Sequence, residues 1–424
     1  MDTRQISRGK IVVFSLVPLL LLLIVLEVAG RIIYPFDSSE RARIQAKRDP
    51  RVELTYLSER ASAQSILEDI YRMEHRYLPF LGWIGRPNIR FPTIQTNDLG
   101  FRDSPIAPRG RDEFRIVILG GSTAWGLGAS SNDTTVAGKL EALLNEESGP
   151  TTYRVMSGAY LGWKSREELI ALMEFHHHFD PDLVISLTGY NDLYALSHRP
   201  EDELLMRPES QLLSKAVEDN LRPMATLTAL RKVAGSMGVW RLVVHFRELA
   251  SLRAPKEWQV QYNSELASKA IPRIVDRYRT MAEYALRHGF HLMLALQPDI
   301  YATKKQLTSE EIEVKKRFAG KAESIERTFS SYRTELIRAL ASLAQSGVTV
   351  ANLTDGLDSV VRPVFIDAPH LNDDGYEVLA RLLKEHIRSV PEPGESQVGM
   401  LMSDAAPLST PFPGHSAGSP QDGR

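Results

Sequence analysis

Five short, mainly apolar runs recur along the middle of the chain, separated by more polar stretches. They occupy residues 115–119, 153–157, 183–188, 290–296 and 348–353. Apolar runs of this length predict strands that are buried on both faces of a sheet. Amphipathic stretches at 135–145 and 165–178 predict helices between the first three strands. Strands that alternate with helices predict an α/β fold, with a parallel sheet in a three-layer αβα sandwich.

A longer apolar run lies near the N-terminus. Residues 11–26 are almost entirely apolar, and apolar residues continue after Glu27, which gives roughly the 20 residues that a helix needs to cross a bilayer. Basic residues precede this run and favour a cytoplasmic N-terminus, although others follow it. The preceding ones are Arg4, Arg8 and Lys10.

A cleaved signal peptide is the alternative for this run. Glu27 would then lie three positions before a cut after Ala29, where a small residue is required. We therefore expect residues 1–34 to be an uncleaved, single-pass transmembrane anchor in the cell membrane. The body of the protein is then expected on the extracytoplasmic (periplasmic) side.

The rest of the chain divides by composition. Residues 35–112 are polar and interrupted by prolines, which predicts a juxtamembrane region with a helix near 55–76, then an extended segment that packs on the main domain. Residues 113–390 carry the strand pattern. Within them, residues 195–260 predict a mostly helical insertion, either a subdomain on the core or a membrane-contacting lid. Residues 391–424 are rich in Pro, Gly, Ser and acidic residues, and we expect a disordered tail.

Charge and cysteine content exclude several classes of protein. A net charge of -2 leaves no basic surface for nucleic acid, so we expect no nucleic-acid partner. The chain has no cysteine, which excludes disulfides, thiol nucleophiles and cysteine metal sites. Gly138-Lys139 is followed by Leu140 and lacks the upstream glycine of a phosphate-binding loop, so we expect no nucleotide cofactor. Composition does not indicate an oligomeric state.

A glycine-rich turn with a serine directly follows the first predicted strand, as Gly120-Gly121-Ser122-Thr123. The carboxyl ends of the strands are where open α/β sheets bind ligands. Glycines let the backbone turn sharply, expose the serine hydroxyl and free N–H groups to stabilise an anion. Alone, such a turn is more often only a turn. With a partner base, Ser122 becomes a candidate nucleophile.

Asp367 and His370 supply such a partner near the end of the domain. They precede a helix for which Asn372 is a suitable N-cap. An Asp three residues before a His can place its carboxylate against the imidazole Nδ1–H. That contact fixes the tautomer in which Nε2 accepts a proton from a serine hydroxyl.

Two further turns carry candidate donors for an oxyanion. Gly189-Tyr190-Asn191-Asp192 follows the third predicted strand, and the Asn191 amide can donate to a developing negative charge. Gly162 ends a turn after the second strand, and its backbone N–H can do the same. Taken singly, each of these turns is more often structural.

Together the four blocks resemble those of the SGNH (GDSL-like) hydrolases, which occur in this order at strand ends. The resemblance covers about residues 113–390 without the insertion. It implies Ser122 as nucleophile, with Asp367 and His370 completing the triad. It implies that the oxyanion hole consists of the backbone N–H groups of Ser122 and Gly162 and the amide of Asn191.

This sequence departs from the family pattern at two positions. The usual Gly-Asp-Ser is Gly-Gly-Ser, and the Asn that often opens the second block is Ser157, which leaves Gly158 as an alternative to Gly162. The rival α/β-hydrolase pattern G-x-S-x-G fits less well, because residues 120–124 lack the final glycine. In that fold the acid and the histidine also lie far apart in sequence.

Three consecutive histidines, His176, His177 and His178, suggest a metal site at first sight. Consecutive helical residues point about 100° apart, so the three cannot meet one ion. At the end of a predicted helix they interact favourably with its dipole instead. We expect no metal.

The resemblance and the predicted anchor together imply an SGNH-type serine esterase that removes acyl or acetyl groups. Acylated envelope glycans are the expected substrates, with lipid esters second. An O-acyltransferase that modifies polysaccharide with the same triad is an alternative. A catalytically silent carbohydrate-binding or scaffold module is another, although such a module has no need for the complete Ser-His-Asp-Asn set.

Overall fold

The computed structural model describes residues 8–33, 38–59, 61–147, 149–198, 262–319, 322–346 and 348–388, with a few positions between 237 and 246. Five strands form one sheet in the order β4-β3-β5-β6-β7, and every neighbouring pair is parallel. Their bounds are β3 (Glu113–Gly120), β4 (Thr152–Ser157), β5 (Leu183–Thr188), β6 (His291–Leu296) and β7 (Thr349–Asn352). All five predicted strands are present, and the predicted α/β class is confirmed.

The strand order reverses direction at β3. β3 pairs with β4 on one side and with β5 on the other, so the chain winds in opposite directions from β3. In doubly wound sheets of this flavodoxin-like order, the loops that leave the carboxyl ends of two such strands diverge to opposite faces and open a crevice. The Ser122 and Asn191 turns follow β3 and β5, so both lie at the carboxyl edge of the sheet, where the order reverses.

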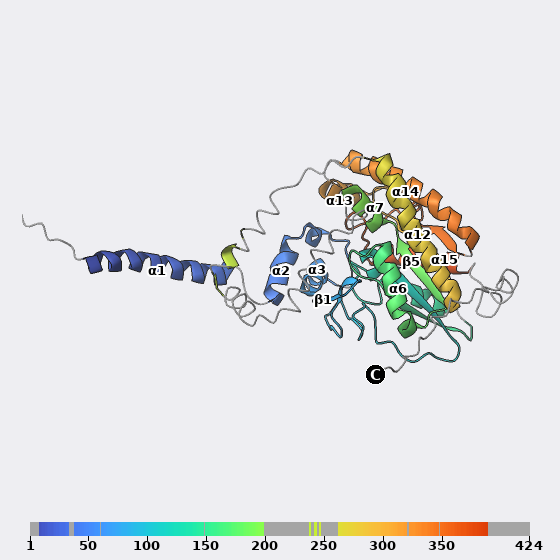
Figure 1. Cartoon of the computed structure of the whole chain (residues 1–424), viewed down its shortest axis with the longest axis horizontal. Helices are drawn as coiled ribbons and strands as arrows, with labels where there is room; N and C mark the ends of the chain where they lie inside the picture. Colours follow the sequence, from blue (N-terminus) through green and yellow to red (C-terminus); the bar gives the residue numbers. More distant parts are fainter. Residues whose placement is uncertain are drawn as a thin grey trace, which may run out of the picture.

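Helices cover both faces of the sheet. α5 (Val136–Glu147) packs against α15 (Asp373–Ile387) on one face, whereas α6 (Ser165–Phe179) packs against α12 (Ser264–His288) on the other (Figure 1). The helices predicted over 135–145 and 165–178 are confirmed as α5 and α6. α15 begins as predicted, because the Asn372 side chain accepts a hydrogen bond from the Gly375 N–H at 2.9 Å.

Several helices of the domain were not predicted. α12 buries a stripe that includes Ile271, Ile274 and Tyr278, at the spacing of one helical face. α13 (Ser309–Ala319) and α14 (Ala322–Leu340) follow β6, and η2 (Ala341–Ser346) leads into β7. The insertion predicted over 195–260 begins inside α7 (Tyr190–His198), but nearly all of it lies outside the described residues, as does the predicted tail 391–424.

Residues 38–112 form more regular structure than the sequence predicted. The helix expected near 55–76 is present as the shorter α3 (Ala63–Arg72). α2 (Ser38–Arg48), the 3₁₀ turn η1 (Pro50–Glu53) and the antiparallel pair β1 (His75–Leu78) and β2 (Gly82–Gly85) were not predicted.

The segment after β2 is extended and packs on the main domain, as expected. Its fully buried Arg102 donates hydrogen bonds to the carbonyl oxygens of Gly126 and Ala129, directly behind the Ser122 turn.

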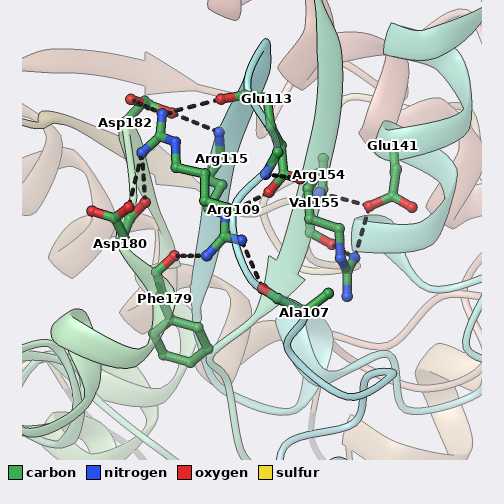
Figure 2. A network of polar contacts seen from close by, with 11 residues as sticks. Ala107, Arg109, Glu113, Arg115, Glu141, Arg154, Val155, Phe179, Asp180 and Asp182 are labelled. Carbon is green, nitrogen blue, oxygen red and sulfur yellow. Dashed lines mark hydrogen bonds and ion pairs between the residues drawn. The ribbon is translucent and has the colours of Figure 1, made fainter.

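The same segment is fastened at the opposite, amino-terminal edge of the sheet. Arg109 forms ion pairs with Asp180 and Asp182, and Arg115 donates to the carbonyl oxygens of Phe179 and Ala107 (Figure 2). The segment therefore contacts the beginning of β3 and the turn that follows its end.

α1 (Arg8–Ile33) is a helix that projects away from the domain in Figure 1. Its described apolar side chains, such as Leu20 and Val25, are exposed. Among the described residues, no helix combines the length and the apolar character that crossing a membrane requires. The transmembrane anchor expected over residues 1–34 therefore stays a prediction.

Candidate active site

The backbone at the end of β3 requires glycine. Gly120 has φ +145°, and a Cβ on it would lie 2.4 Å from the Leu187 carbonyl oxygen of the neighbouring strand. The chain then turns into the short helix α4 (Ser122–Trp125), which Gly126 ends in the left-handed conformation at φ +88°. This turn places Ser122 at the first position of α4, above the sheet edge and partly exposed.

Ser122, His370 and Asp367 form one continuous chain of hydrogen bonds. His370 Nε2 lies 2.6 Å from Ser122 Oγ, and His370 Nδ1 lies 2.6 Å from Asp367 Oδ1. The same Asp367 oxygen also accepts from the His370 backbone N–H at 3.1 Å. The structure thus brings the three predicted residues together, with the histidine between acid and hydroxyl.

Arg51, which the sequence analysis did not identify, binds the other carboxylate oxygen of Asp367. Arg51 of η1 donates from Nη1 to Asp367 Oδ2 at 2.9 Å. Burial alone would raise the pKa of the Asp367 carboxyl, but the charge and hydrogen bonds of His370 and the charge of Arg51 hold that pKa below its usual range. Asp367 is therefore ionised and can stabilise an imidazolium.

The loop that carries Asp367 and His370 is tied to the turn that carries Ser122. Thr123 Oγ1 donates to the Pro369 carbonyl oxygen at 3.0 Å and accepts from Gln297 Nε2 at 3.0 Å. The Ile300 N–H donates to the Ala368 carbonyl oxygen at 2.9 Å. These contacts thus hold the Ser122 turn and the loop of Asp367 and His370 together.

A buried ion pair supports the same loop from below. Glu311 accepts from the backbone N–H groups of Val364 and Phe365, at 2.9 and 3.2 Å, and its second oxygen lies 2.5 Å from Lys305 Nζ. Both side chains of the pair have no exposed surface. Since breaking such a pair would leave a buried charge, it fixes the path of the chain into Asp367.

The Asn191 amide lies against the nucleophile turn. Its Nδ2 donates to the Trp163 carbonyl oxygen at 2.8 Å. A Cβ on Gly121 would fall 2.1 Å from this Nδ2, so the amide occupies the space that a side chain at position 121 would need. A residue with a side chain at position 121 would therefore displace the Asn191 amide from this place. The Asn191 amide carries two hydrogens, and the bond to the Trp163 carbonyl oxygen uses one of them.

Asp192, the residue after Asn191, sets the position of this donor. Its carboxylate accepts from the Ser165 N–H at 3.1 Å and from the Ser165 hydroxyl at 2.6 Å. These bonds join the first turn of α7 to the first turn of α6, which begins two residues after Trp163.

The two candidate glycines of the second block differ in their surroundings. A Cβ on Gly158 would lie 2.9 Å from the Leu119 side chain and 3.0 Å from that of Val117, so Gly158 serves packing against β3. Gly162 has φ +75° and nothing within 4 Å of its ideal Cβ. Gly162 also adjoins Trp163, whose carbonyl binds Asn191. The open position therefore favours Gly162 as the oxyanion donor.

The three histidines lie in the last turn of α6, as predicted. His176 Nδ1 lies 2.6 Å from the Tyr284 hydroxyl, and its ring contacts that of His288. Across the described ranges, no group of three His, Cys, Asp or Glu side chains is arranged to hold a metal ion.

Comparisons with known proteins give loose likenesses only. No protein-family model and no curated protein sequence matches the chain. Three solved structures that it resembles are TesA, the acetylxylan esterase Axe2 from Geobacillus stearothermophilus and a GDSL-like lipase from Bacteroides thetaiotaomicron. Identities are 14, 12 and 13%, and TM-scores are 0.35, 0.36 and 0.33. The matches cover 65, 65 and 67% of this chain and 99, 94 and 93% of the others. At such low values we base the function on the geometry of the site alone.

Proposed function

We propose that this protein is a serine ester hydrolase of the SGNH (GDSL-like) type. One observation carries the proposal. Ser122 Oγ, the His370 imidazole and the Asp367 carboxylate are linked by two hydrogen bonds of 2.6 Å at the carboxyl ends of a parallel sheet. Nucleophile, base and orienting acid in this relation are the arrangement that activates a serine hydroxyl for acyl transfer.

The reaction follows from these contacts. Ser122 Oγ attacks the ester carbonyl while His370 Nε2 accepts its proton, and the ionised Asp367 stabilises the imidazolium. The negative charge on the carbonyl oxygen is bound by the N–H groups of Ser122 and Gly162 and by the Asn191 amide. His370 then returns the proton to the leaving alcohol, and water activated by the same histidine releases the acyl group.

Acylated carbohydrate is the substrate class that we propose, with lipid ester second. Tyr190 and Tyr194 flank Asn191 on α7, with nearly parallel rings 6.1 Å apart. The Tyr194 side chain is 43% exposed. An exposed aromatic side chain on the helix that carries Asn191 suits the flat apolar face of a sugar ring, and its low conformational entropy favours binding.

A membrane location on the extracytoplasmic side is a separate proposal. It is supported by the apolar residues 11–26, by the basic residues ahead of them and by the exposed apolar side chains of α1. Full-length protein is expected to fractionate with membranes, and a reporter fused after residue 390 is expected to be active only if it works outside the cytoplasm. Activity of a cytoplasm-specific reporter there would refute the orientation.

Labelling with a serine-reactive fluorophosphonate tests the enzymatic proposal. Wild-type protein should be labelled and should hydrolyse p-nitrophenyl acetate. Ser122→Ala should abolish labelling, and Ser122→Ala or His370→Ala should each lower turnover by about a thousandfold or more, because a triad acts as a unit. Wild-type turnover by Ser122→Ala would refute the assignment. A properly folded wild-type protein that is neither labelled nor active would instead support a silent binding module.

A further inference from the structure

We propose that Arg51 is a positioning residue of the active site, which fixes the Asp367 carboxylate against His370 and keeps it anionic. The segment that precedes the sheet would then be part of the catalytic unit. This inference rests on the proposed ester hydrolysis for its kinetic readout, and its spectroscopic readout does not need a substrate.

The geometry assigns one Asp367 oxygen to each partner. Oδ1 accepts from His370, and Oδ2 accepts from Arg51 Nη1 at 2.9 Å. A carboxylate held at both oxygens cannot rotate about its terminal bond. It therefore presents Oδ1 to His370 Nδ1 in one orientation.

Arg51 is itself held in place. Asp49 accepts from Arg51 Nε at 3.0 Å and from Nη2 at 2.8 Å, and Tyr71 donates from its hydroxyl to Asp49 at 2.7 Å. This two-point contact leaves Nη1 as the nitrogen that reaches Asp367. The planar guanidinium is suited to such paired recognition, whereas an ammonium is not.

The segment after Arg51 docks along the loop that carries the triad. The Tyr56 hydroxyl donates to the Phe365 carbonyl oxygen at 2.9 Å, and Asn372 Nδ2 donates to the Tyr56 carbonyl oxygen at 2.8 Å. The Ser58 hydroxyl donates to Asp373 at 2.9 Å. Docking is therefore shared by several contacts, so Arg51 can be changed without releasing the segment.

Burial strengthens the electrostatic attraction between Arg51 and Asp367. The side chains of Arg51 and Asp367 are only 13% and 10% exposed, so water and salt screen their attraction weakly. Without the guanidinium, His370 alone would oppose the effect of burial, so the pKa of Asp367 would rise from its present, lowered value. A protonated Asp367 cannot stabilise the imidazolium, so the loss of Arg51 should lower the rate of hydrolysis most at acidic pH.

The kinetic test compares three variants over about pH 5 to 9. Arg51→Met should lower kcat/KM about 10- to 100-fold, the worth of a charge-assisted hydrogen bond, and should move the acidic limb of the profile to higher pH. Arg51→Lys keeps a cation, so its acidic limb should stay near that of the wild type while turnover falls in part. Tyr56→Phe is the matched control, because it weakens docking and leaves the charge.

The spectroscopic test follows the proton between His370 and Asp367 by NMR. The downfield Nδ1–H resonance, assigned by its absence from His370→Gln, should be present in the wild type and Arg51→Lys. In Arg51→Met it should be lost at a higher pH than in the wild type.

The pH profile and the proton resonance together distinguish the positioning role of Arg51 from the proposed ester hydrolysis. An acidic limb and a proton resonance unchanged in Arg51→Met, or moved equally by Tyr56→Phe, would overturn the role of Arg51 and reduce it to a docking contact. A resonance that responds to Arg51 as expected in a wild-type protein that hydrolyses no ester would support the positioning and refute the proposed function.

Discussion

Replacing Gly121 by alanine tests the oxyanion site through a single methyl group. Gly121 has φ −87° and ψ −151°, in the extended region that alanine also adopts, so the backbone itself tolerates the change. The added Cβ would lie 2.1 Å from Asn191 Nδ2, far inside contact distance. The effect of the substitution is therefore steric and falls on Asn191.

The size of the effect follows from that overlap. Asn191 must retreat by roughly 1 Å, and a displacement of that size at a catalytic group costs about a hundredfold in rate. Its hydrogen bond to the Trp163 carbonyl oxygen, now 2.8 Å, would be strained at the same time. Overpacking of this kind destabilises a fold by about 1–3 kcal/mol, which most domains of this size survive.

The measurement combines turnover on p-nitrophenyl acetate with fluorophosphonate labelling and thermal unfolding. Gly121→Ala should keep labelling detectable, because Ser122, His370 and Asp367 are untouched, while turnover falls. Gly149→Ala is the matched control, since nothing lies within 4 Å of its ideal Cβ. Wild-type turnover by a folded Gly121→Ala protein would refute the placement of the Asn191 amide at the oxyanion.

Asn191→Ala should lower turnover about a hundredfold with labelling retained, and unchanged turnover would make the Asn191 turn purely structural. Burial raises the pKa of Glu168 to about 8, so the stability that its protonated form contributes is fully present below pH 4.5 and is lost as the pH rises to about 8. Glu168→Gln should therefore raise the melting temperature more at pH 8 than at pH 5, and an equal shift would contradict the raised pKa. Arg102→Met removes the guanidinium that binds the buried Thr93 carbonyl oxygen and should destabilise the protein by about 3 kcal/mol in denaturant unfolding, and an unchanged stability would contradict this role.

The sheet and the four blocks could be predicted because their signals are local. A buried parallel strand is a continuous apolar run, and β5 was predicted at its observed bounds, Leu183–Thr188. The Ser122 and Asn191 blocks follow such runs directly, the Asp367–His370 block comes after the last run, and all parallel strands end at one edge. Their order along the chain was therefore enough to gather Ser122, Asn191 and His370 at that edge.

What could not be predicted depends on contacts between distant parts of the chain. Arg51 and Asp367 are 316 positions apart, and nothing in the sequence around Arg51 distinguishes it from the other basic residues nearby. The close approach of Gly121 and Asn191 likewise appears only when β3 and β5 lie side by side. α12 could have been predicted from the sequence, because Asn263 caps it and its apolar residues recur at helical spacing, although Pro272 interrupts the pattern.

The burial of Arg102 has a consequence for where the protein can be shortened. A truncation at residue 113, the start of the strand pattern, would keep every residue of the triad. It would nevertheless remove the guanidinium that fills the space behind the nucleophile turn, stacked 4.8 Å from the Trp125 ring. We therefore expect residues 38–112 to fold together with the sheet as one unit. A soluble version for crystallisation or screening is best begun before α2, and a version begun at β3 is expected to aggregate.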